Sequence, residues 1–199
     1  AADPDLIKIR DERGYSYADI ITVHPDHLPQ FDMKVKAFFE EHIHDAEEVR
    51  FIINGSGFFD VRDLDDRWIR IHIKGGDLMT LPEGIYHRFT CDSLDYIHAM
   101  RLFKGSPVWT PFNRPQEDHP SRQLYVDTFI PKEDKALMQN PHFPEAWYIP
   151  DNIEDQKALN KLEPNDPVSA AQLKALGILY WHLPGQYEYP VKAIPWDPT

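Results

Sequence analysis

Apolar and polar side chains alternate over short distances between residues 48 and 103, and glycine-containing turns interrupt the alternation at 54–57, 74–76 and 82–84. A period of two predicts β-strands, and tight turns between them predict antiparallel pairing. In the segment 68–73, isoleucine occupies every second position, so we expect a strand with one buried face and one polar face. The pattern predicts a β-sandwich or a β-barrel.

Helical periodicity precedes this region. Phe31, Val35 and Phe38 recur at the spacing of one helix face, which predicts a helix that runs to about Glu41 and leads the chain into the first strand. The region after the predicted strands is rich in proline instead. The prolines spread over residues 107–144 are expected to limit regular structure there.

One more helix and one more strand are expected near the end of the chain. Ser169 and Gln172 have the spacing of a capping box, which predicts a helix start, and Gly177 can end that helix. The apolar residues 178–181 then predict a final strand.

Composition narrows the class of protein. The chain has 199 residues, of which 42% are hydrophobic, enough for one domain over residues 1–199 with a buried core. The formal net charge of −12 would repel a phosphate backbone, so we expect no nucleic-acid partner. Cys91 is the only cysteine, which excludes an internal disulfide. Since no apolar stretch approaches about 18 residues, we expect no membrane insertion and a cytosolic setting.

The candidate chemistry lies in the segment 41–50. On an extended strand, alternate side chains share a face, so His42, His44, Glu48 and Arg50 would point into one cavity. Neutral imidazoles with one carboxylate suit Fe, Ni, Mn or Zn. The segment therefore predicts a metal site, with a merely polar strand face as the alternative.

His87 provides a fourth candidate ligand. It follows the turn at 82–84, where a second strand is predicted to begin, and a barrel can bring that strand next to the first. His24 and His27 lie outside this pattern and are expected to be exposed to solvent or to cap a local turn.

The spacing of these residues resembles the two motifs of the cupin superfamily, small β-barrels that hold a metal inside. The motifs are His42-x-His44-x3-Glu48-x6-Gly55 and Gly76-x5-Pro82-x-Gly84-x2-His87. The second motif usually ends with an asparagine after its histidine, and Cys91 stands at that position here. The resemblance implies a mainly β fold with several helices, a cupin barrel of the double-stranded β-helix or jelly-roll type.

Longer segments resemble the acireductone dioxygenase family of methionine salvage. They are residues 14–17, 40–44, 53–63, 81–89, 101–103, 107–109 and 113–115. The resemblance implies an oxidoreductase that uses O2 to cleave 1,2-dihydroxy-5-(methylthio)pent-1-en-3-one, or acireductone. It also implies one Fe²⁺ or Ni²⁺ per chain, held by His42, His44, Glu48 and His87.

The metal determines the products that the resemblance implies. The Fe form would give formate and 4-methylthio-2-oxobutanoate, and the Ni form would give formate, carbon monoxide and 3-methylthiopropionate. We expect a monomer in the cytoplasm, with the nucleus as a second location. Its expected partners are only the small-molecule substrate and O2. Two other functions stay open: a cupin dioxygenase with another substrate, and a binding or regulatory cupin whose metal is structural.

Two arginines are candidate catalytic residues. Arg50 resembles the family's substrate-binding arginine and would stabilise negative charge on the enediolate, whereas the alternative is a salt bridge with a carboxylate such as Glu41. Arg101 alternates with apolar residues, on a face where a lone arginine is costly unless it meets an anion. Structural ion pairing is the alternative for Arg101.

Three aromatic residues, Phe38, Phe89 and Trp109, match family positions that line the substrate pocket and would receive the methylthio tail. Ordinary core packing is the alternative for all three. Cys91 shares the strand parity of His87 and Phe89, so it can lie near the cavity, but nothing nearby indicates an activated thiolate.

The order of segments differs from that of the family. Residues 138–199 match the family's N-terminal block, yet here they follow the barrel of residues 42–110. The chain therefore looks circularly permuted about Leu137 and Met138, either covalently or as an artefact of the residue order. In both cases we expect the two ends of the chain to be spatial neighbours.

Overall fold

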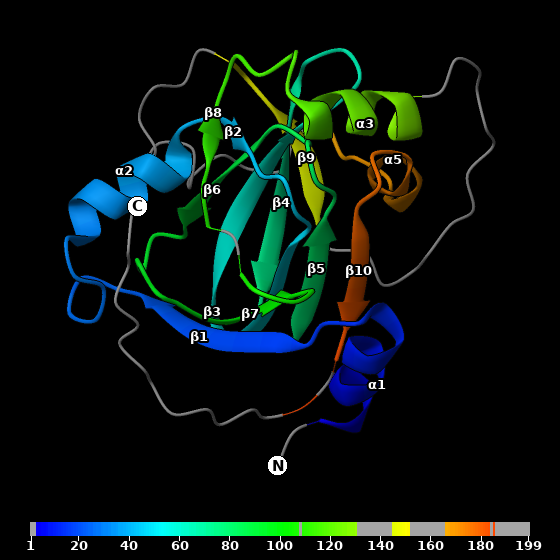
Figure 1. The fold of residues 1–199 in the computed structure, drawn as a ribbon. Helices are drawn as coiled ribbons and strands as arrows, with labels where there is room; N and C mark the ends of the chain where they lie inside the picture. Colours follow the sequence, from blue (N-terminus) through cyan, green and yellow to red (C-terminus); the bar gives the residue numbers. More distant parts are fainter. Residues whose placement is uncertain (1–2, 108, 131–144, 152–165, 184, 186–199) are drawn as a thin grey trace.

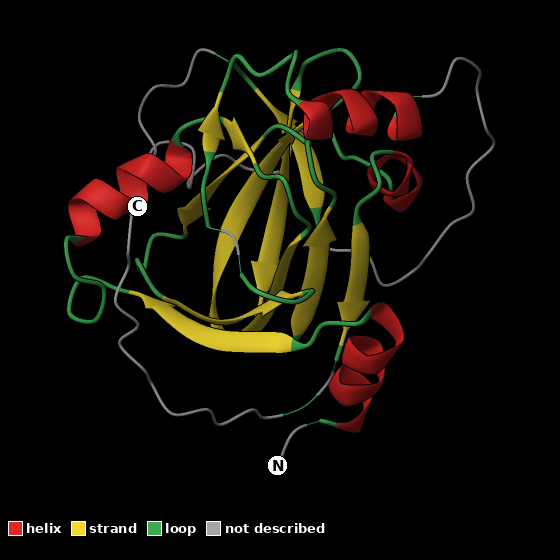
Figure 2. Cartoon of the chain, viewed as in Figure 1, coloured by secondary structure: helices red, strands yellow, loops and turns green. Residues whose placement is uncertain are grey.

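A computed structural model describes residues 3–107, 109–130, 145–151, 166–183 and 185 (Figure 1). In these residues ten strands form one curved antiparallel sheet, with the helices at its periphery (Figure 2). A cavity lies among the strands. The strands are β1 (Tyr17–Val23), β2 (His42–Ile43), β3 (Glu48–Arg62), β4 (Trp68–Lys74), β5 (Asp77–Leu81), β6 (His87–Cys91), β7 (Ile97–Phe103), β8 (Phe112–Asn113), β9 (Ala146–Ile149) and β10 (Leu179–His182).

The long strand β3 joins the two sides of the sheet. Its first part pairs with β5 and β7, and its second part pairs with β4 and β6. The change follows a register shift between Ile52 and Asn54. Gly55 comes next with φ of 78°, and a Cβ there would collide with the carbonyl oxygen of Tyr96. Glycine is required at this bend because an L side chain has neither the backbone freedom nor the space.

The antiparallel strands between residues 48 and 103 confirm the prediction from alternation, but the expectation of a half-exposed β4 is wrong. Arg70 lies on the presumed polar face and is 0% exposed. It donates two hydrogen bonds to Asp60, at 2.6 Å and 2.8 Å, and β9 pairs along the other edge of β4. The ion pair with Asp60 and the pairing with β9 bury this face of β4, although its polar residues predicted exposure to solvent.

Two predicted helices are confirmed. Helix α2 (Phe31–Phe39) ends just before β2, and its phenylalanines pack against the core. Helix α5 (Ala170–Ala175) begins with the expected capping box at Ser169, and Gly177 follows it with φ of 81°.

Two further helices were not expected. Helix α3 (Pro120–Phe129) lies inside the proline-rich segment, so the prediction of irregular structure is wrong there. Pro120 is tolerated because the first turn of a helix needs no N–H donor from it. Helix α1 (Pro4–Arg13) is capped by Asp3, whose side chain accepts hydrogen bonds from the next turn.

The segment compared with the family's N-terminal block contributes β9 and β10, which pair with β4 and β5. The junction at Leu137 and Met138 and the two ends of the chain lie outside the described residues. None of the helices in the described part of the chain is long and apolar enough to cross a membrane.

Candidate metal centre

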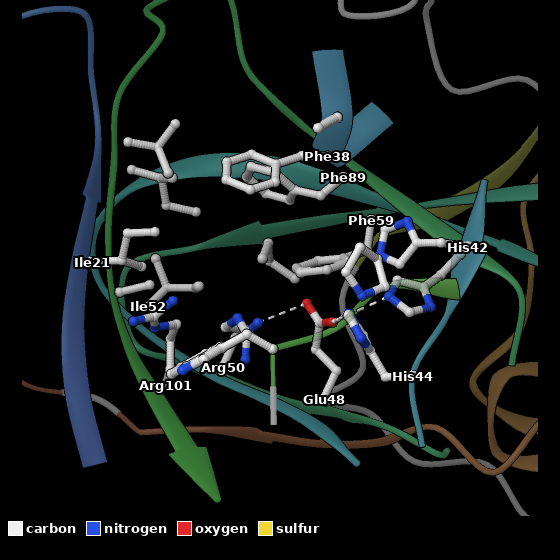
Figure 3. A pocket seen from close by; sticks show the side chains of 18 residues that line it. Ile21, Phe38, His42, His44, Glu48, Arg50, Ile52, Phe59, Phe89 and Arg101 are labelled. Atoms are coloured by element: carbon white, nitrogen blue, oxygen red, sulfur yellow. Dashed lines mark hydrogen bonds and ion pairs between the residues drawn. The ribbon is translucent and has the colours of Figure 1, made fainter. Parts of the chain in front are cut away.

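Three histidines and one glutamate converge at one end of the cavity (Figure 3). His42 lies on β2 and His44 directly follows that strand, whereas Glu48 begins β3 and His87 begins β6. One ligand atom from each of the four lies within 4.8 Å of the others. The sequence therefore named a set of residues that the fold does bring together.

The reason for their convergence differs from the one predicted. Residues 42–50 do not form one extended strand, because a bend at Asp45 and Ala46 separates β2 from β3. Glu48 thus arrives from a different strand than His42, and His87 pairs with His42 across β2 and β6. Closure of the sheet, rather than shared parity along one strand, assembles the cluster.

Backbone carbonyls fix the three imidazoles in one tautomer. The Nδ1 atoms of His42, His44 and His87 lie 2.7 Å, 2.9 Å and 2.9 Å from the carbonyl oxygens of Glu40, Thr110 and Ile85. A carbonyl oxygen only accepts, so each Nδ1 must carry the proton and each Nε2 must offer a lone pair. Three lone pairs beside a carboxylate fit a divalent metal ion, and the carbonyls hold the rings in place for it.

Two of the four ligands have pKa values shifted in the direction that favours metal binding. Desolvation, together with the neighbouring imidazoles of His87 and His44, lowers the pKa of His42 to about 3. For Glu48, burial opposes ionisation, but the charge of Arg50 and the neighbouring imidazoles of His44 and His87 prevail and hold its pKa well below the usual value. His42 and Glu48 therefore need lose no proton before they bind a cation at neutral pH.

Arg50 lies directly beside this cluster. Its Nη2 is 3.1 Å from Oε1 of Glu48, and its Nη1 donates to the carbonyl oxygen of Val49 at 3.0 Å. The expected partner Glu41 pairs instead with Arg62 and Arg114. Burial lowers the pKa of Arg50, although Glu48 counteracts this effect, and a guanidinium remains charged in either case.

Arg101 forms the structural ion pair that sequence reasoning left as an alternative. Its Nε and Nη2 each donate to a carboxylate oxygen of Asp19 at 2.7 Å. The side chain nevertheless lines the same cavity as Arg50. Asp19 was missed because its strand, β1, was not recognised as a neighbour of β7.

The three predicted aromatic residues, Phe38, Phe89 and Trp109, all line the cavity. Further apolar residues line it that sequence reasoning did not single out; they include Ile21, Ile52, Phe59, Ile97 and Ala99. Strand parity carried a signal for three of them, since Ile52 shares the parity of Arg50, and Ile97 and Ala99 share that of Arg101.

Three other predicted residues lie apart from this site. Cys91 is buried in the main hydrophobic core rather than among the lining residues. Desolvation raises the pKa of its thiol to about 12, which disfavours the thiolate. His27 is exposed, and Nδ1 of His24 accepts a local hydrogen bond from the backbone N–H of Asp26.

Comparison with known proteins connects this site to a family. The ARD/ARD' family model matches residues 1–111. Acireductone dioxygenase 3 of Physcomitrium patens is 56% identical over 135 residues, which cover 67% of this chain and 66% of that protein. The acireductone dioxygenase of Ixodes scapularis is 58% identical over 126 residues, which cover 63% and 69%. The chain thus spans about two thirds of the length of these relatives.

A solved structure agrees with the sequence comparison. Acireductone dioxygenase from Bacillus anthracis, with a cadmium ion in its active centre, superposes with a TM-score of 0.50 at 30% identity, covering 54% of this chain and 62% of that one. The curved antiparallel sheet is accordingly the expected cupin fold. Since the family model covers more than half of the residues, the chain belongs to the ARD/ARD' family.

Proposed function

We propose that this chain is an acireductone dioxygenase, which cleaves 1,2-dihydroxy-5-(methylthio)pent-1-en-3-one with O2 in methionine salvage. One observation carries the proposal: three imidazoles, each held by a backbone carbonyl at Nδ1, turn Nε2 toward one carboxylate beside a partly buried arginine. Relatives that are 56% to 58% identical have acireductone dioxygenase as their name.

His42, His44, Glu48 and His87 would hold one Fe²⁺ or Ni²⁺, since nitrogen ligands with one carboxylate suit both ions. When bound, such an ion supplies Lewis-acid chemistry that brings the enediolate and O2 together. The buried Glu48 contributes one negative charge, so the loaded centre retains a net positive charge toward an anionic substrate.

The cavity has the two-part character that this substrate needs. Arg50 and Arg101 face each other across β3 and β7 and give its polar end. The next row of the same strands, Ile52 and Ala99, with Ile21 from β1, is apolar (Figure 3). Arg50 would stabilise charge on the enediolate, while the apolar row would receive the methylthio tail and exclude water.

Metal identity would decide the products. With Fe, the six carbons of acireductone are expected in formate and 4-methylthio-2-oxobutanoate. With Ni, they are expected in formate, carbon monoxide and 3-methylthiopropionate. Both sets contain the atoms of one acireductone and one O2, so the same chain can support either outcome.

The test is anaerobic reconstitution with Fe²⁺ or Ni²⁺, followed by addition of acireductone and oxygenated buffer. Loss of the enediol absorbance and the identities of the products are measured against metal-free protein. Turnover above that control, with the product set changing with the metal, supports the proposal. A loaded protein that consumes no O2 would indicate a binding or regulatory role, and faster turnover of a different enediol would indicate another dioxygenase.

A further inference from the structure

A row of charged residues crosses three neighbouring strands at the polar end of the cavity. Asp19 on β1 is the register partner of Arg101 on β7, and Arg101 is the register partner of Arg50 on β3. Like charges placed directly opposite in an antiparallel pair repel each other. Arg101 and Arg50 are therefore tolerated side by side only because a carboxylate flanks each of them, Asp19 on one side and Glu48 on the other.

The contact between Asp19 and Arg101 also fixes the orientation of the Arg101 guanidinium. Both carboxylate oxygens accept hydrogen bonds, at 2.7 Å each, and the two side chains are only 11% and 7% exposed. Two parallel charge-assisted hydrogen bonds hold a guanidinium plane in one orientation. Asp19 therefore determines how the flat face of Arg101 is presented to its surroundings.

The indole ring of Trp109 packs against the flat face of the Arg101 guanidinium. The guanidinium carbon of Arg101 lies 3.5 Å from the ring centroid of Trp109, and Phe103 meets the same ring edge-on with centroids 4.4 Å apart. Residues 104–107 and 109–111 form no helix or strand. No β-ladder fixes Trp109, so its ring depends on these side-chain contacts for its place at the cavity wall.

We propose that Asp19 is a positioning residue of this site: through Arg101 it holds Trp109 in place as a wall of the substrate cavity. Asp19 is not among the residues that line the cavity, so it acts on substrate only through Arg101. Within the described part of the chain, Asp19 forms an ion pair with Arg101 alone, whereas Glu48 would be shared between Arg50 and the metal, so Arg50 is the cation that the enediolate meets. The identity of the substrate rests on the proposed function, whereas the connection from Asp19 to Trp109 does not.

The variant Asp19→Asn keeps the shape of the side chain but removes its charge. We expect it to retain full metal content and to raise the anaerobic Kd and the KM for acireductone about tenfold, with kcat within about twofold. Asp19→Glu, which restores the charge, should recover part of the loss. Asp65→Asn is the matched control, because it makes the same change at an exposed aspartate paired with Arg67 and should alter neither constant.

A double-mutant cycle separates this role from general stabilisation. In a Trp109→Leu background, Asp19→Asn should have little further effect on Kd, because the residue on which it acts is gone. A second readout needs no substrate: the fluorescence component that Trp109→Phe removes should be quenched by acrylamide more readily in Asp19→Asn than in wild type.

Two results would overturn the proposal: unchanged Kd and quenching in Asp19→Asn, or an equal loss of affinity in the wild-type and Trp109→Leu backgrounds. If Asp19→Asn does not fold, Asp19→Glu carries the quenching test, because the longer side chain displaces the pair while keeping its charge. If wild-type protein fails to turn over acireductone, the proposed function fails, but the quenching result still decides whether Asp19 positions Trp109.

Discussion

His42 and His87 face each other directly across β2 and β6, with ring centroids 4.4 Å apart. The two strands are distant in sequence, so the pair exists only when the sheet has closed. In the unfolded chain the four candidate ligands do not form a site. A metal ion would therefore bind only the folded protein, and its binding free energy would add to the free energy of unfolding. This relationship predicts that a bound metal stabilises the folded protein.

We expect a chelator to lower the melting temperature. At a metal concentration of about one hundred times Kd, binding to the native state alone adds about 2.7 kcal/mol to the free energy of unfolding. For a chain of this size, that corresponds to about 5 to 10 °C in Tm. Differential scanning fluorimetry with and without Ni²⁺ measures the shift.

The variant His87→Ala should lose this metal-dependent shift and bind well below one ion per chain. Removing one nitrogen ligand leaves three groups that were oriented for a complete set. His27→Ala is the control, because that histidine is exposed and lies outside the cluster. Stoichiometric metal in purified His87→Ala, together with wild-type activity, would disprove the ligand assignment.

Arg50→Met should retain its metal but lose activity. Its guanidinium lies beside Glu48 and lines the cavity, so its charge acts on bound substrate rather than on the ion. Loss of one preorganised electrostatic contact costs about 10² to 10³ in kcat/KM. Arg67→Met, at an exposed arginine, should match wild type. Equal kcat/KM values for Arg50→Met and wild type at full metal occupancy would remove Arg50 from the mechanism.

Three of the four ligands were predictable because His42, His44 and Glu48 lie close together in the sequence, and the distant His87 was indicated by the turn before its strand. The histidine-rich segment and the later His87 provide few alternatives, and strand alternation places the strands between residues 48 and 103 with useful accuracy. The helix Pro4–Arg13 was also predictable from the sequence. Asp3 before Pro4, and Gly14 beyond the last turn, are ordinary helix boundary signals that were not used.

Other features depended on which strands become neighbours, and periodicity along one chain does not encode that choice. Asp19 and Arg101 become partners through the register of β1 and β7. In the same way, Arg70 is buried because it pairs with Asp60 on β3. The polar pattern of β4 alone does not reveal this partner, and it therefore predicted that Arg70 would be exposed to solvent. Long-range register determined the partners of the buried charges, and local composition did not.

The thiol of Cys91 should be inert in the folded protein at pH 8. Desolvation, reinforced by Asp95 and Asp92, raises its pKa from the usual 9.0 to about 12. Between pH 9 and 12 the thiol therefore stays protonated in the native state but is ionised in the unfolded state. The free energy of unfolding falls as pH rises through this range. A disulfide reagent such as DTNB should react slowly with native protein and promptly in urea. Prompt reaction of the native protein at pH 8 would show that the thiol is accessible.

Asp60→Asn should be among the most destabilising single changes in the sheet. Asp60 is 1% exposed and accepts hydrogen bonds from both Arg70 and Arg88, each of which is itself buried. Removing the carboxylate charge leaves two guanidinium groups without their counter-charge, which costs about 3 to 5 kcal/mol when a buried pair is broken.

Urea denaturation of Asp60→Asn measures this cost, with Asp65→Asn as the control for the same chemical change at an exposed ion pair. The control should lie within about 0.5 kcal/mol of wild type. The aromatic rings of Phe58 and Trp68 flank the two arginines, with guanidinium carbons 5.0 Å and 4.2 Å from the ring centroids. If these cation–π contacts were the main stabilising force, Asp60→Asn would cost less than about 1 kcal/mol. A larger loss assigns the stability of this face to the carboxylate.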